Sequence, residues 1–416
     1  MPVEVSSQAS FFEWCSYKKL SMSLNKAHKI KLNPTNNQKI FFEKSFGTAR
    51  FTYNWALNKW QEDYKSGVKQ SAYNLIKHLN SIKKTDFPWM LDVGKTCGQY
   101  AIHNVESAYK KMWKEKTGYP KFKKKGVMDS FVAIEKYRDF KQKDNKLWIP
   151  RLGWVKCHED LRFDGKVNNV VISKKAGMYF ASINIISNEA LIISENQTVV
   201  GVDLGIKHLA TCSDGTVFEN PKALKSNLKS LKKLQRSVSR KDKGSNNRKK
   251  AIEKLAKKHY KVGCIRKNAL HQATSVLAKN YGTVVIEDLN VKGMVKNHKL
   301  AQAISDVGFG EFRSQLEYKA KWHGSNVIVA NRFYPSSKIC SCCGNKKETL
   351  KLSERIYNCH VCGNTIDRDL NASKNLAKLA LLGNPKDVKP AEQTKTSDSS
   401  GRVAMKQELL FNNINN

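Results

Sequence analysis

Hydrophobic and polar residues follow two different spacings in the first third of the chain. Ala27–Leu32 alternates polar and apolar residues, which predicts a β-strand. Thr35 and Gln38 then form a capping box, the signal of a helix N-terminus, and apolar residues follow at intervals of three and four. These residues are Phe42, Phe46, Ala49, Tyr53, Ala56 and Trp60. Because similar spacing continues to about Trp113, we predict a helical unit over residues 35–115.

The spacing changes to two after a basic segment, Tyr119–Gly126 (YPKFKKKG), in which two aromatic residues lie among the lysines. Short segments bounded by glycine, asparagine and aspartate turns follow, and each predicts a strand. They cover residues 131–134, 146–149, 153–157, 167–173 and 178–185. We predict that they form a β-barrel module. The strand at 27–32 could join it, which would make the helical unit an insertion.

A second β region begins near residue 197. Gln197–Gly205 (QTVVGVDLG) predicts a buried strand that carries Asp203. The next two segments, residues 207–212 and 216–218, are joined by Asp214-Gly215, a strong hairpin signal. We therefore predict an antiparallel meander, which is the arrangement of an RNase H-like fold.

Positive charge is clustered and not spread evenly. The chain has 74 lysines and arginines against 36 acids, a formal net charge of +38. Residues 222–267 hold 18 of the basic residues and only two acids, while apolar residues still recur at helical spacing. We predict a basic helical hairpin that faces nucleic-acid phosphates, since neutralising phosphates releases condensed counterions. The alternative is a solvated charged face, although such a face usually mixes both signs.

Targeting signals are not found in the sequence. The chain has no run of 18 apolar residues, so we predict no transmembrane helix and no membrane partner. The N-terminus lacks the basic and apolar regions of a secretory signal, and we expect a cytoplasmic protein. Residues 1–25 and 384–416 show no periodic pattern. We expect the first to be weakly ordered and the second to be a flexible tail.

Four of the ten cysteines stand in two matched knuckles, CSCCG and CHVCG, with 15 residues between them. This spacing predicts a structural Zn²⁺ site whose ligands are Cys340, Cys343, Cys359 and Cys362. The alternative is a redox dithiol, which two matched knuckles disfavour. The other cysteines show no pairing pattern, and we interpret most of them as small buried hydrophobic residues. They are Cys15, Cys97, Cys157, Cys212, Cys264 and Cys342.

Three acids accompany the predicted core elements. Asp203 lies on the first strand of the meander, and Glu287 ends a second apolar strand, residues 283–286. Asp369 lies where a loop enters a helix, although an acid at such a place is often only an N-cap. Phosphodiester hydrolysis can use two Mg²⁺ ions about 4 Å apart, and hard cations prefer carboxylate oxygens. We predict that the three acids together bind catalytic Mg²⁺.

Several segments together resemble the TnpB (OrfB) family of transposon-encoded, RNA-guided DNA endonucleases, which are related to the compact type V CRISPR effectors. The core segments are VVGVDLGIKHLATCSDG, VVIEDLNVKGM, RFYPSSKICSCCG and CHVCGNTIDRDLNASKNLA. LNPTNNQKIFFEKSFGTARFTYN resembles the N-terminal helix-turn-helix of the family, and YPKFKKKG resembles its central basic motif. The likeness covers roughly residues 27–380.

The resemblance implies an α/β multi-domain protein with an RNase H-like (RuvC-type) nuclease core. It implies a guide RNA and a double-stranded DNA target that is cleaved beside a short duplex motif. Carried over residue by residue, Asp203 and Glu287 are the first two catalytic acids. The third is Asp369, because it stands two residues before Asn371-Ala372, and Asp367 is the alternative. We expect a monomer in the cytoplasm of a bacterium or archaeon, associated with the nucleoid when it is on DNA.

The predicted parts follow one another from a weakly ordered N-terminus to a flexible tail. They are the N-terminus (1–25), the first strand of the β-barrel or wedge module (26–34), an inserted helical recognition domain (35–120), the rest of the barrel (121–196), the nuclease core with its basic hairpin (197–335, hairpin 222–267), the zinc ribbon (336–366), the last part of the core (367–383) and the tail (384–416).

Two other functions use the same features. A transposase could join DNA strands with the same three acids, and a regulator could bind DNA or RNA without cleaving it. We identify no separate domain for transposon ends, which counts against the first. All three acidic positions are intact, which counts against the second.

Overall fold

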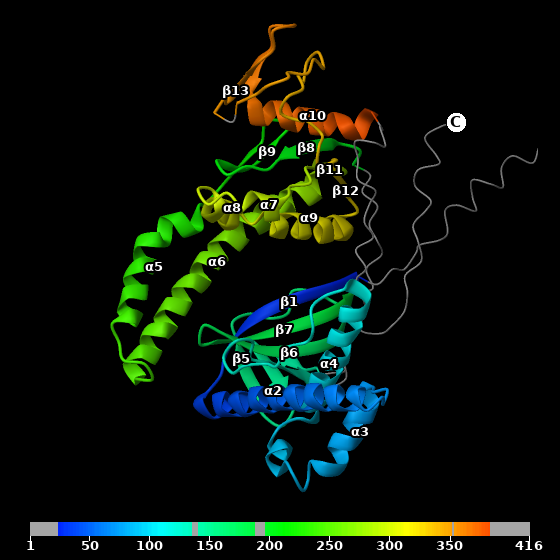
Figure 1. Ribbon diagram of the computed structural model, residues 1–416, viewed down its shortest axis with the longest axis vertical. Helices are drawn as coiled ribbons and strands as arrows, with labels where there is room; N and C mark the ends of the chain where they lie inside the picture. Colours follow the sequence, from blue (N-terminus) through cyan, green and yellow to red (C-terminus); the bar gives the residue numbers. More distant parts are fainter. Residues whose placement is uncertain (1–23, 135–139, 188–195, 352, 383–416) are drawn as a thin grey trace, which may run out of the picture. The chain divides into compact units, whose positions relative to one another are not determined.

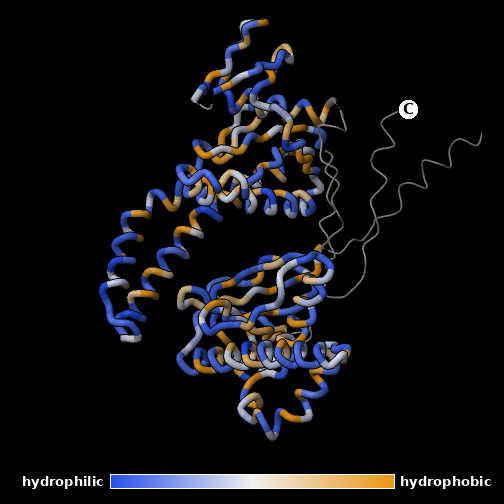
Figure 2. The backbone as a smooth tube through the Cα atoms, in the orientation of Figure 1, coloured by the Kyte–Doolittle hydropathy of each residue, from blue (hydrophilic) through white to orange (hydrophobic). Residues whose placement is uncertain are grey.

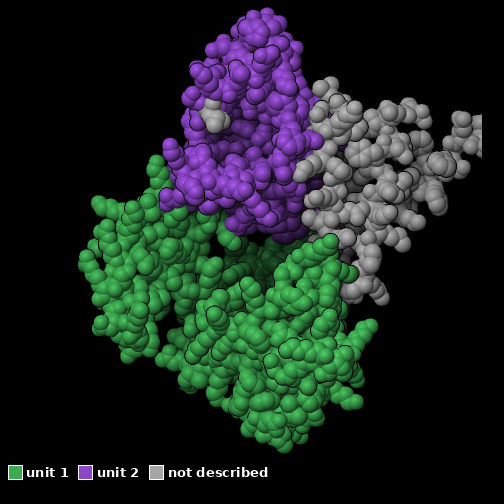
Figure 3. Space-filling view, viewed as in Figure 1, with its two compact units in different colours: residues 1–193, 223–267 green, residues 194–222, 268–416 purple. Residues whose placement is uncertain are grey.

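The computed structural model describes residues 24–134, 140–187, 196–351 and 353–382. The chain forms two compact units (Figure 3). Unit 1 comprises residues 1–193 and 223–267, and unit 2 comprises residues 194–222 and 268–416. The tail predicted at 384–416, and nearly all of the N-terminus predicted at 1–25, lie outside the described residues. No helix within the described ranges is long and apolar enough to cross a membrane.

Unit 1 contains a seven-stranded antiparallel sheet. Its strands are β1 (Leu24–Asn33), β2 (Ser130–Ile134), β3 (Gln142–Lys143), β4 (Lys146–Ile149), β5 (Gly153–Cys157), β6 (Lys166–Lys175) and β7 (Met178–Ser187). Their order is β2-β6-β7-β1-β5-β4-β3. Strand β1 pairs with β7 and β5, so the segment between β1 and β2 is inserted within one sheet.

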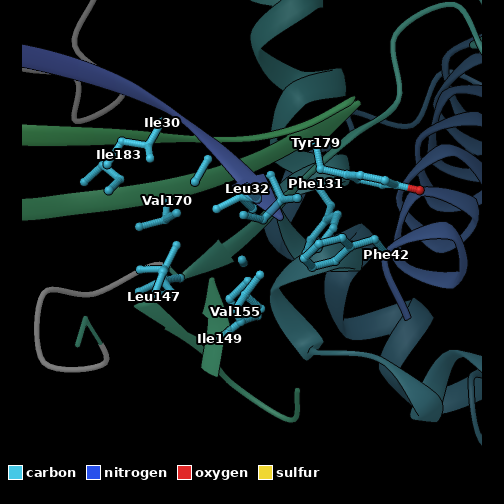
Figure 4. Packing of buried hydrophobic residues seen from close by; sticks show 14 of the residues in the cluster. Ile30, Leu32, Phe42, Phe131, Leu147, Ile149, Val155, Val170, Tyr179 and Ile183 are labelled. Atoms are coloured by element: carbon cyan, nitrogen blue, oxygen red, sulfur yellow. The ribbon is translucent and has the colours of Figure 1, made fainter. Parts of the chain in front are cut away.

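One apolar core underlies this sheet (Figure 4). Alternate residues of β1 are buried, as the alternating sequence predicts, and they meet inward-facing residues of the other strands. The labelled members include Ile30, Leu147, Val155, Val170 and Ile183. Among the described residues no ladder joins the outer strands β2 and β3. The observed structure is therefore an antiparallel sheet, and its closure into a barrel stays a prediction.

The inserted segment is helical. It contains α2 (Asn36–Lys65), α3 (Ala72–Ile82), the 3₁₀ helix η2 (Pro88–Asp92) and α4 (Lys95–Glu115). Thr35 and Gln38 form the predicted capping box at the start of α2. Tyr53 and Trp60 are buried in the helical core, and the Trp60 ring stacks on Tyr109 with a centroid separation of 5.1 Å. These two aromatic residues therefore contribute to core packing.

Helices α5 (Ala223–Ser239) and α6 (Asn246–Asn280) form a basic hairpin. Gly244 has a φ of 88°, which suits the turn, and Arg248 donates hydrogen bonds to two carbonyls near the end of α5. Hydrophobic positions recur between hydrophilic ones along both helices (Figure 2). Ala223, Leu231 and Val262 form one buried cluster within this apolar stripe. Residues 223–267 belong to the compact unit 1, and their assignment to the nuclease core stays a prediction.

Unit 2 contains a five-stranded sheet. Its strands are β8 (Val199–Asp203), β9 (His208–Cys212), β10 (Val217–Glu219), β11 (Thr283–Ile286) and β12 (Asn326–Val329). Their order is β10-β9-β8-β11-β12. Strands β8, β9 and β10 form the predicted antiparallel meander, whereas β11 runs parallel to both β8 and β12. Because parallel strands end at the same edge of a sheet, residues that follow β11 meet the end of β8.

Helices cover both faces of this sheet (Figure 1). One face carries α7 (Val291–Met294), α8 (Ala301–Val307) and α9 (Phe309–His323), and the other carries α10 (Arg368–Leu382). Helix α10 packs tightly on β8 at Gly201. A Cβ atom at that position would overlap the backbone oxygen of Ser373 and the backbone nitrogen of Ala377. The absence of a side chain at Gly201 therefore fixes the position of α10.

Candidate catalytic and metal sites

Asp203 and Glu287 lie side by side because of strand register. Val202 of β8 pairs with Ile286 of the parallel strand β11. Asp203, the last residue of β8, and Glu287, the residue after β11, therefore lie at the same level and at the same edge of the sheet. Both side chains are half-buried. Two carboxylates thus lie close together with limited access to solvent. Repulsion between their charges and partial loss of solvation disfavour ionisation of both.

Asp369 reaches the same edge from the first turn of α10. Burial raises the pKa of the Asp203 carboxyl well above its usual range, and the charges of Glu287 and Asp369 raise it further. Burial also raises the pKa of Glu287, a hydrogen bond from Ser336 opposes this shift, and the charge of Asp369 adds to it. The structure therefore brings the three predicted acids close enough to perturb one another.

Asp367, the alternative third acid, has a different set of contacts. Its Oδ1 accepts hydrogen bonds from the backbone N–H groups of Asp369 at 2.9 Å and Leu370 at 3.2 Å. These are the bonds of a helix N-cap, and the Asp367 side chain is exposed. The Asp369 carboxylate instead lies 3.4 Å from the Arg368 guanidinium and is 16% exposed. The capping interpretation thus applies to Asp367, which leaves Asp369 beside the other acids.

Residues around the acids have partners that we did not predict from the sequence. The Ser336 hydroxyl donates a hydrogen bond to the Glu287 carboxylate. Asp288, next in the chain, is only 7% exposed and pairs with Arg313 at 3.2 Å and Arg332 at 2.6 Å. The segment RFYPSS, which contains Arg332 and Ser336, was visible as a motif. A polar loop offers many pairings, however, and its sequence alone does not choose among them.

The four predicted zinc ligands form one cluster. The Sγ atoms of Cys340 and Cys362 are 3.7 Å apart, those of Cys343 and Cys359 are 3.6 Å apart, and all four lie within 4.8 Å of one another. A tetrahedral site with Zn–S bonds of about 2.3 Å places its sulfurs about 3.8 Å apart. The cluster therefore fits a zinc ion. No other group of three or more potential ligands in the described part of the chain is as closely spaced.

The zinc-ribbon segment is attached to the helix that carries Asp369. Strands β13 (Ile356–Asn358) and β14 (Thr365–Asp367) pair next to the second knuckle. The Asn371 side chain of α10 donates to the carbonyl of Ile339 at 2.7 Å and accepts from the N–H of Ser341 at 2.8 Å. A stable first knuckle therefore holds the first turn of α10.

The cysteines outside the cluster mostly match their interpretation as small buried residues. Cys97, Cys157 and Cys212 are buried, and burial raises the pKa of each thiol. Cys264 and Cys342 are exposed instead. Cys15 lies outside the described residues.

Known protein families match three parts of the chain. A model described as "Probable transposase" matches residues 189–298, which include Asp203 and Glu287. A model described as "Cas12f1-like, TNB domain" matches residues 309–376, which include the cysteine cluster and Asp369. A model described as "Helix-turn-helix domain" matches residues 22–69, from the start of β1 beyond the end of α2.

Two relatives align with most of the chain. The "Putative RNA-guided DNA endonuclease" of Streptomyces pristinaespiralis is 33% identical over 398 residues, which cover 94% of this chain and 97% of that protein. The "Putative RNA-guided DNA endonuclease InsQ" of Escherichia coli (strain K12) is 32% identical over 370 residues, which cover 84% of this chain and 91% of that protein.

One solved structure has a similar fold. It comes from the cryo-EM structure of the Cas12f1-sgRNA-target DNA complex, with a TM-score of 0.55 and 14% sequence identity. The alignment covers 88% of this chain and 100% of the chain in that structure. At this level of identity the likeness concerns the mixed α/β fold alone.

Proposed function

Because the chain belongs to the TnpB (OrfB) family, we propose that it is an RNA-guided DNA endonuclease that cleaves its target beside a short duplex motif. The observation that carries this proposal is the meeting of Asp203, Glu287 and Asp369 at one edge of the unit 2 sheet. The relatives described as putative RNA-guided DNA endonucleases align with this chain over most of their own length.

The architecture of unit 2 supports a nuclease core of the RNase H-like (RuvC) type. Three antiparallel strands are followed by two parallel ones in the order β10-β9-β8-β11-β12. Helices lie on both faces of the sheet, and the acids lie on the first strand, after the fourth strand and on the final helix. Of this arrangement we predicted from the sequence the antiparallel meander that carries Asp203, the strand before Glu287 and the helix that begins near Asp369.

The three carboxylates would hold two Mg²⁺ ions, which activate water and neutralise the leaving oxygen during phosphodiester hydrolysis. The raised pKa values of Asp203 and Glu287 are consistent with cation binding. Neighbouring carboxylates repel one another, and a bound cation would offset this repulsion and stabilise their charged forms. Ser336 would orient Glu287 by its hydrogen bond, and Asp367 would hold the first turn of α10 in place.

A structural zinc ion at Cys340, Cys343, Cys359 and Cys362 would stabilise the zinc-ribbon segment. The Asn371 hydrogen bonds would transmit this stability to α10 and thereby to Asp369. Zinc in this position has a supporting role, because four protein ligands leave no place for water or substrate.

The nucleic-acid partners would be contacted mainly outside unit 2. The α5–α6 hairpin is almost free of acids and would face the phosphate backbone. The helices α2 to α4 and the unit 1 sheet would recognise the guide–target duplex and its adjacent motif. A protein of this class reads shape and a short duplex element, and base pairing supplies the rest of the specificity.

The test is to sequence the RNA that co-purifies with the full chain and to offer plasmids that match or do not match it. Guided cleavage predicts breaks only in the matching plasmid, with no strand joining. The "Probable transposase" description of the family raises the alternative of strand transfer. Recovery of joined DNA products, or cleavage that does not depend on the RNA sequence, would show that the proposal is wrong.

A further inference from the structure

The loop at residues 331–337 follows β12, and all of its residues except Phe333 line one side of a cleft beside Glu287. The cleft has a volume of about 340 Å³. Its other wall is the segment that follows β11, residues 287–290. One of the proposed catalytic acids, Glu287, therefore lines the same cleft as the loop, and a DNA strand that lies in this cleft contacts both.

Several hydrogen bonds fix the shape of this loop. The side-chain oxygen of Asn331 accepts from the N–H of Phe333 at 3.0 Å, and its carbonyl accepts from the N–H of Tyr334 at 2.9 Å. Asn375 of α10 is buried and donates its amide to the carbonyl of Ser336 at 2.8 Å. The Tyr334 hydroxyl donates to the carbonyl of Asn375 at 3.4 Å. The loop is therefore held at both ends.

Arg332 is held at the rim of the cleft by a buried acid. One N–H group of its guanidinium donates to Asp288 at 2.6 Å, and Asp288 is only 7% exposed. The Arg332 side chain itself is 43% exposed and lines the cleft. A guanidinium has five N–H donors in a planar fork that suits a phosphate. Asp288 thus orients a phosphate-binding group whose remaining surface faces solvent.

Phe333 is the most exposed large hydrophobic residue in the described part of the chain, at 88%. A single exposed hydrophobic residue is common on protein surfaces and carries no meaning by itself. Here, however, Phe333 follows Arg332 directly on a fixed loop and stands between two residues, Arg332 and Tyr334, that line the cleft beside Glu287. Exposed aromatic rings beside positive charge are the elements with which proteins bind single strands.

We propose that Arg332 and Phe333 hold the unpaired DNA strand that lies in the cleft beside Glu287. Arg332 binds a backbone phosphate next to the bond that is cut, and Phe333 stacks on a neighbouring base. Stacking requires an open base face, which a single strand offers and an intact duplex does not. The inference rests on the proposed nuclease function, because that function makes the strand at Glu287 a DNA strand.

The test uses the full chain with Asp203→Asn, which prevents cutting, and a single-stranded 20-nucleotide DNA that contains 5-bromouracil. Ultraviolet cross-linking followed by mass spectrometry identifies the residues that stack on the bases. We expect a cross-link at Phe333. We expect Phe333→Leu to remove it and to weaken binding about tenfold, whereas Phe333→Tyr keeps both. Arg332→Lys and Arg332→Gln should weaken binding, and Gln should lower the salt slope by about one.

Leu381→Ala is the control, because it removes another strongly exposed hydrophobic side chain, 71% exposed, from the last turn of α10 and outside the lining of the cleft. It should leave the affinity unchanged. Cross-links that avoid Phe333, together with unchanged binding in Phe333→Leu, would overturn the inference. So would a Phe333 cross-link that forms with an RNA of the same sequence in preference to the DNA. This experiment measures strand binding and not guided cleavage. A negative result here would therefore overturn the role of Arg332 and Phe333 without deciding whether the protein is an RNA-guided nuclease.

Discussion

Asp203 is a residue at which folding and the proposed catalysis make opposite demands. Its carboxyl is partly enclosed at the end of β8, and two further acids lie nearby. The raised pKa means that the charged form is less stable in the folded chain than in the unfolded one. The proposed binding of Mg²⁺ requires the charged form. The site therefore has a cost in stability that a bound cation relieves.

This conflict predicts a stabilising substitution. In buffer without Mg²⁺, Asp203→Asn should raise the free energy of unfolding near neutral pH by about 1 kcal/mol, because it removes a charge that repels its neighbours. The folded pKa lies above the unfolded value of about 3.9, so wild-type stability falls as pH rises between these two values. The Asn variant cannot ionise at this position, so its free energy of unfolding should not show the part of the decrease with pH that Asp203 causes. Urea unfolding of both proteins at several pH values, without a zinc chelator, measures the difference.

Substitutions of the two acids at the start of α10 should have different effects. Asp369→Asn should abolish cleavage and keep RNA binding, because it removes a charge next to Asp203. Asp367→Asn should still cleave, since asparagine caps a helix as well as aspartate does. Asp367→Ala should lower the stability by about 1 kcal/mol through loss of the cap. Cleavage by Asp369→Asn and not by Asp367→Asn would show that our assignment is wrong by two residues.

At the residue scale the sequence indicates the candidate ligands more clearly than the residues that form hydrogen bonds and ion pairs around them. The acids and the CxxC knuckles have distinctive spacing or a distinctive place in an element. Ser336, Arg313 and Arg332 do not, because a serine or arginine in a loop or on a helix is compatible with many partners. Only the packing of α10 and α9 against the sheet decides that Ser336 meets Glu287 and that both arginines meet Asp288.

Among the elements, α10 connects the sheet, the cysteine cluster and the third acid. It can approach β8 closely because residue 201 is glycine. Gly201→Ala should therefore displace α10, lower the melting temperature and reduce cleavage. Gly263→Ala on α6 is the matched control, because no atom lies within 4 Å of the added Cβ. In a helix this change should stabilise by about 0.5–1 kcal/mol. Equal melting temperatures for Gly201→Ala and wild type would contradict the close packing.

The cysteine cluster gives a second prediction for an element. The purified protein should contain about one zinc per chain, measured by elemental analysis, and release it only on unfolding or strong chelation. Cys359→Ser should lose the zinc and make the zinc-ribbon segment sensitive to protease. Cys342→Ser is the control, because Cys342 lies within the first knuckle but outside the ligand set. It should retain the metal. Absence of zinc from the wild-type protein would refute the site.

The long elements were largely predictable from the sequence, and their assembly was predictable only in part. The capping box and the apolar spacing of α2, and the alternation in β1, each describe a local structure with one buried face. The pairing of β1 with β7 joins residues that lie more than a hundred positions apart, and the alternation allows it without specifying it. The short strands β3 and β13 carry too few residues for a pattern to appear.

For the whole molecule, the charge distribution predicts how binding depends on salt. Reversal of Lys232, Lys233 and Arg236 to Glu on α5 should weaken RNA or DNA binding and flatten the plot of log affinity against log salt concentration. Replacement of the same three residues by Gln should give an intermediate slope, because it removes charge without reversing it. An unchanged slope in the Glu variant would mean that this face of the hairpin meets only solvent.

The most direct test of the central claim is cleavage of a matched plasmid by the RNA-loaded full chain and by its Asp203→Asn, Glu287→Gln and Asp369→Asn variants. Wild type should cut with Mg²⁺ or Mn²⁺ and poorly with Ca²⁺, whose looser coordination suits the transition state less well. Each variant should bind RNA and target as wild type does but should not cut. Guided cutting that survives in any of these variants would contradict a single catalytic site built from these three acids.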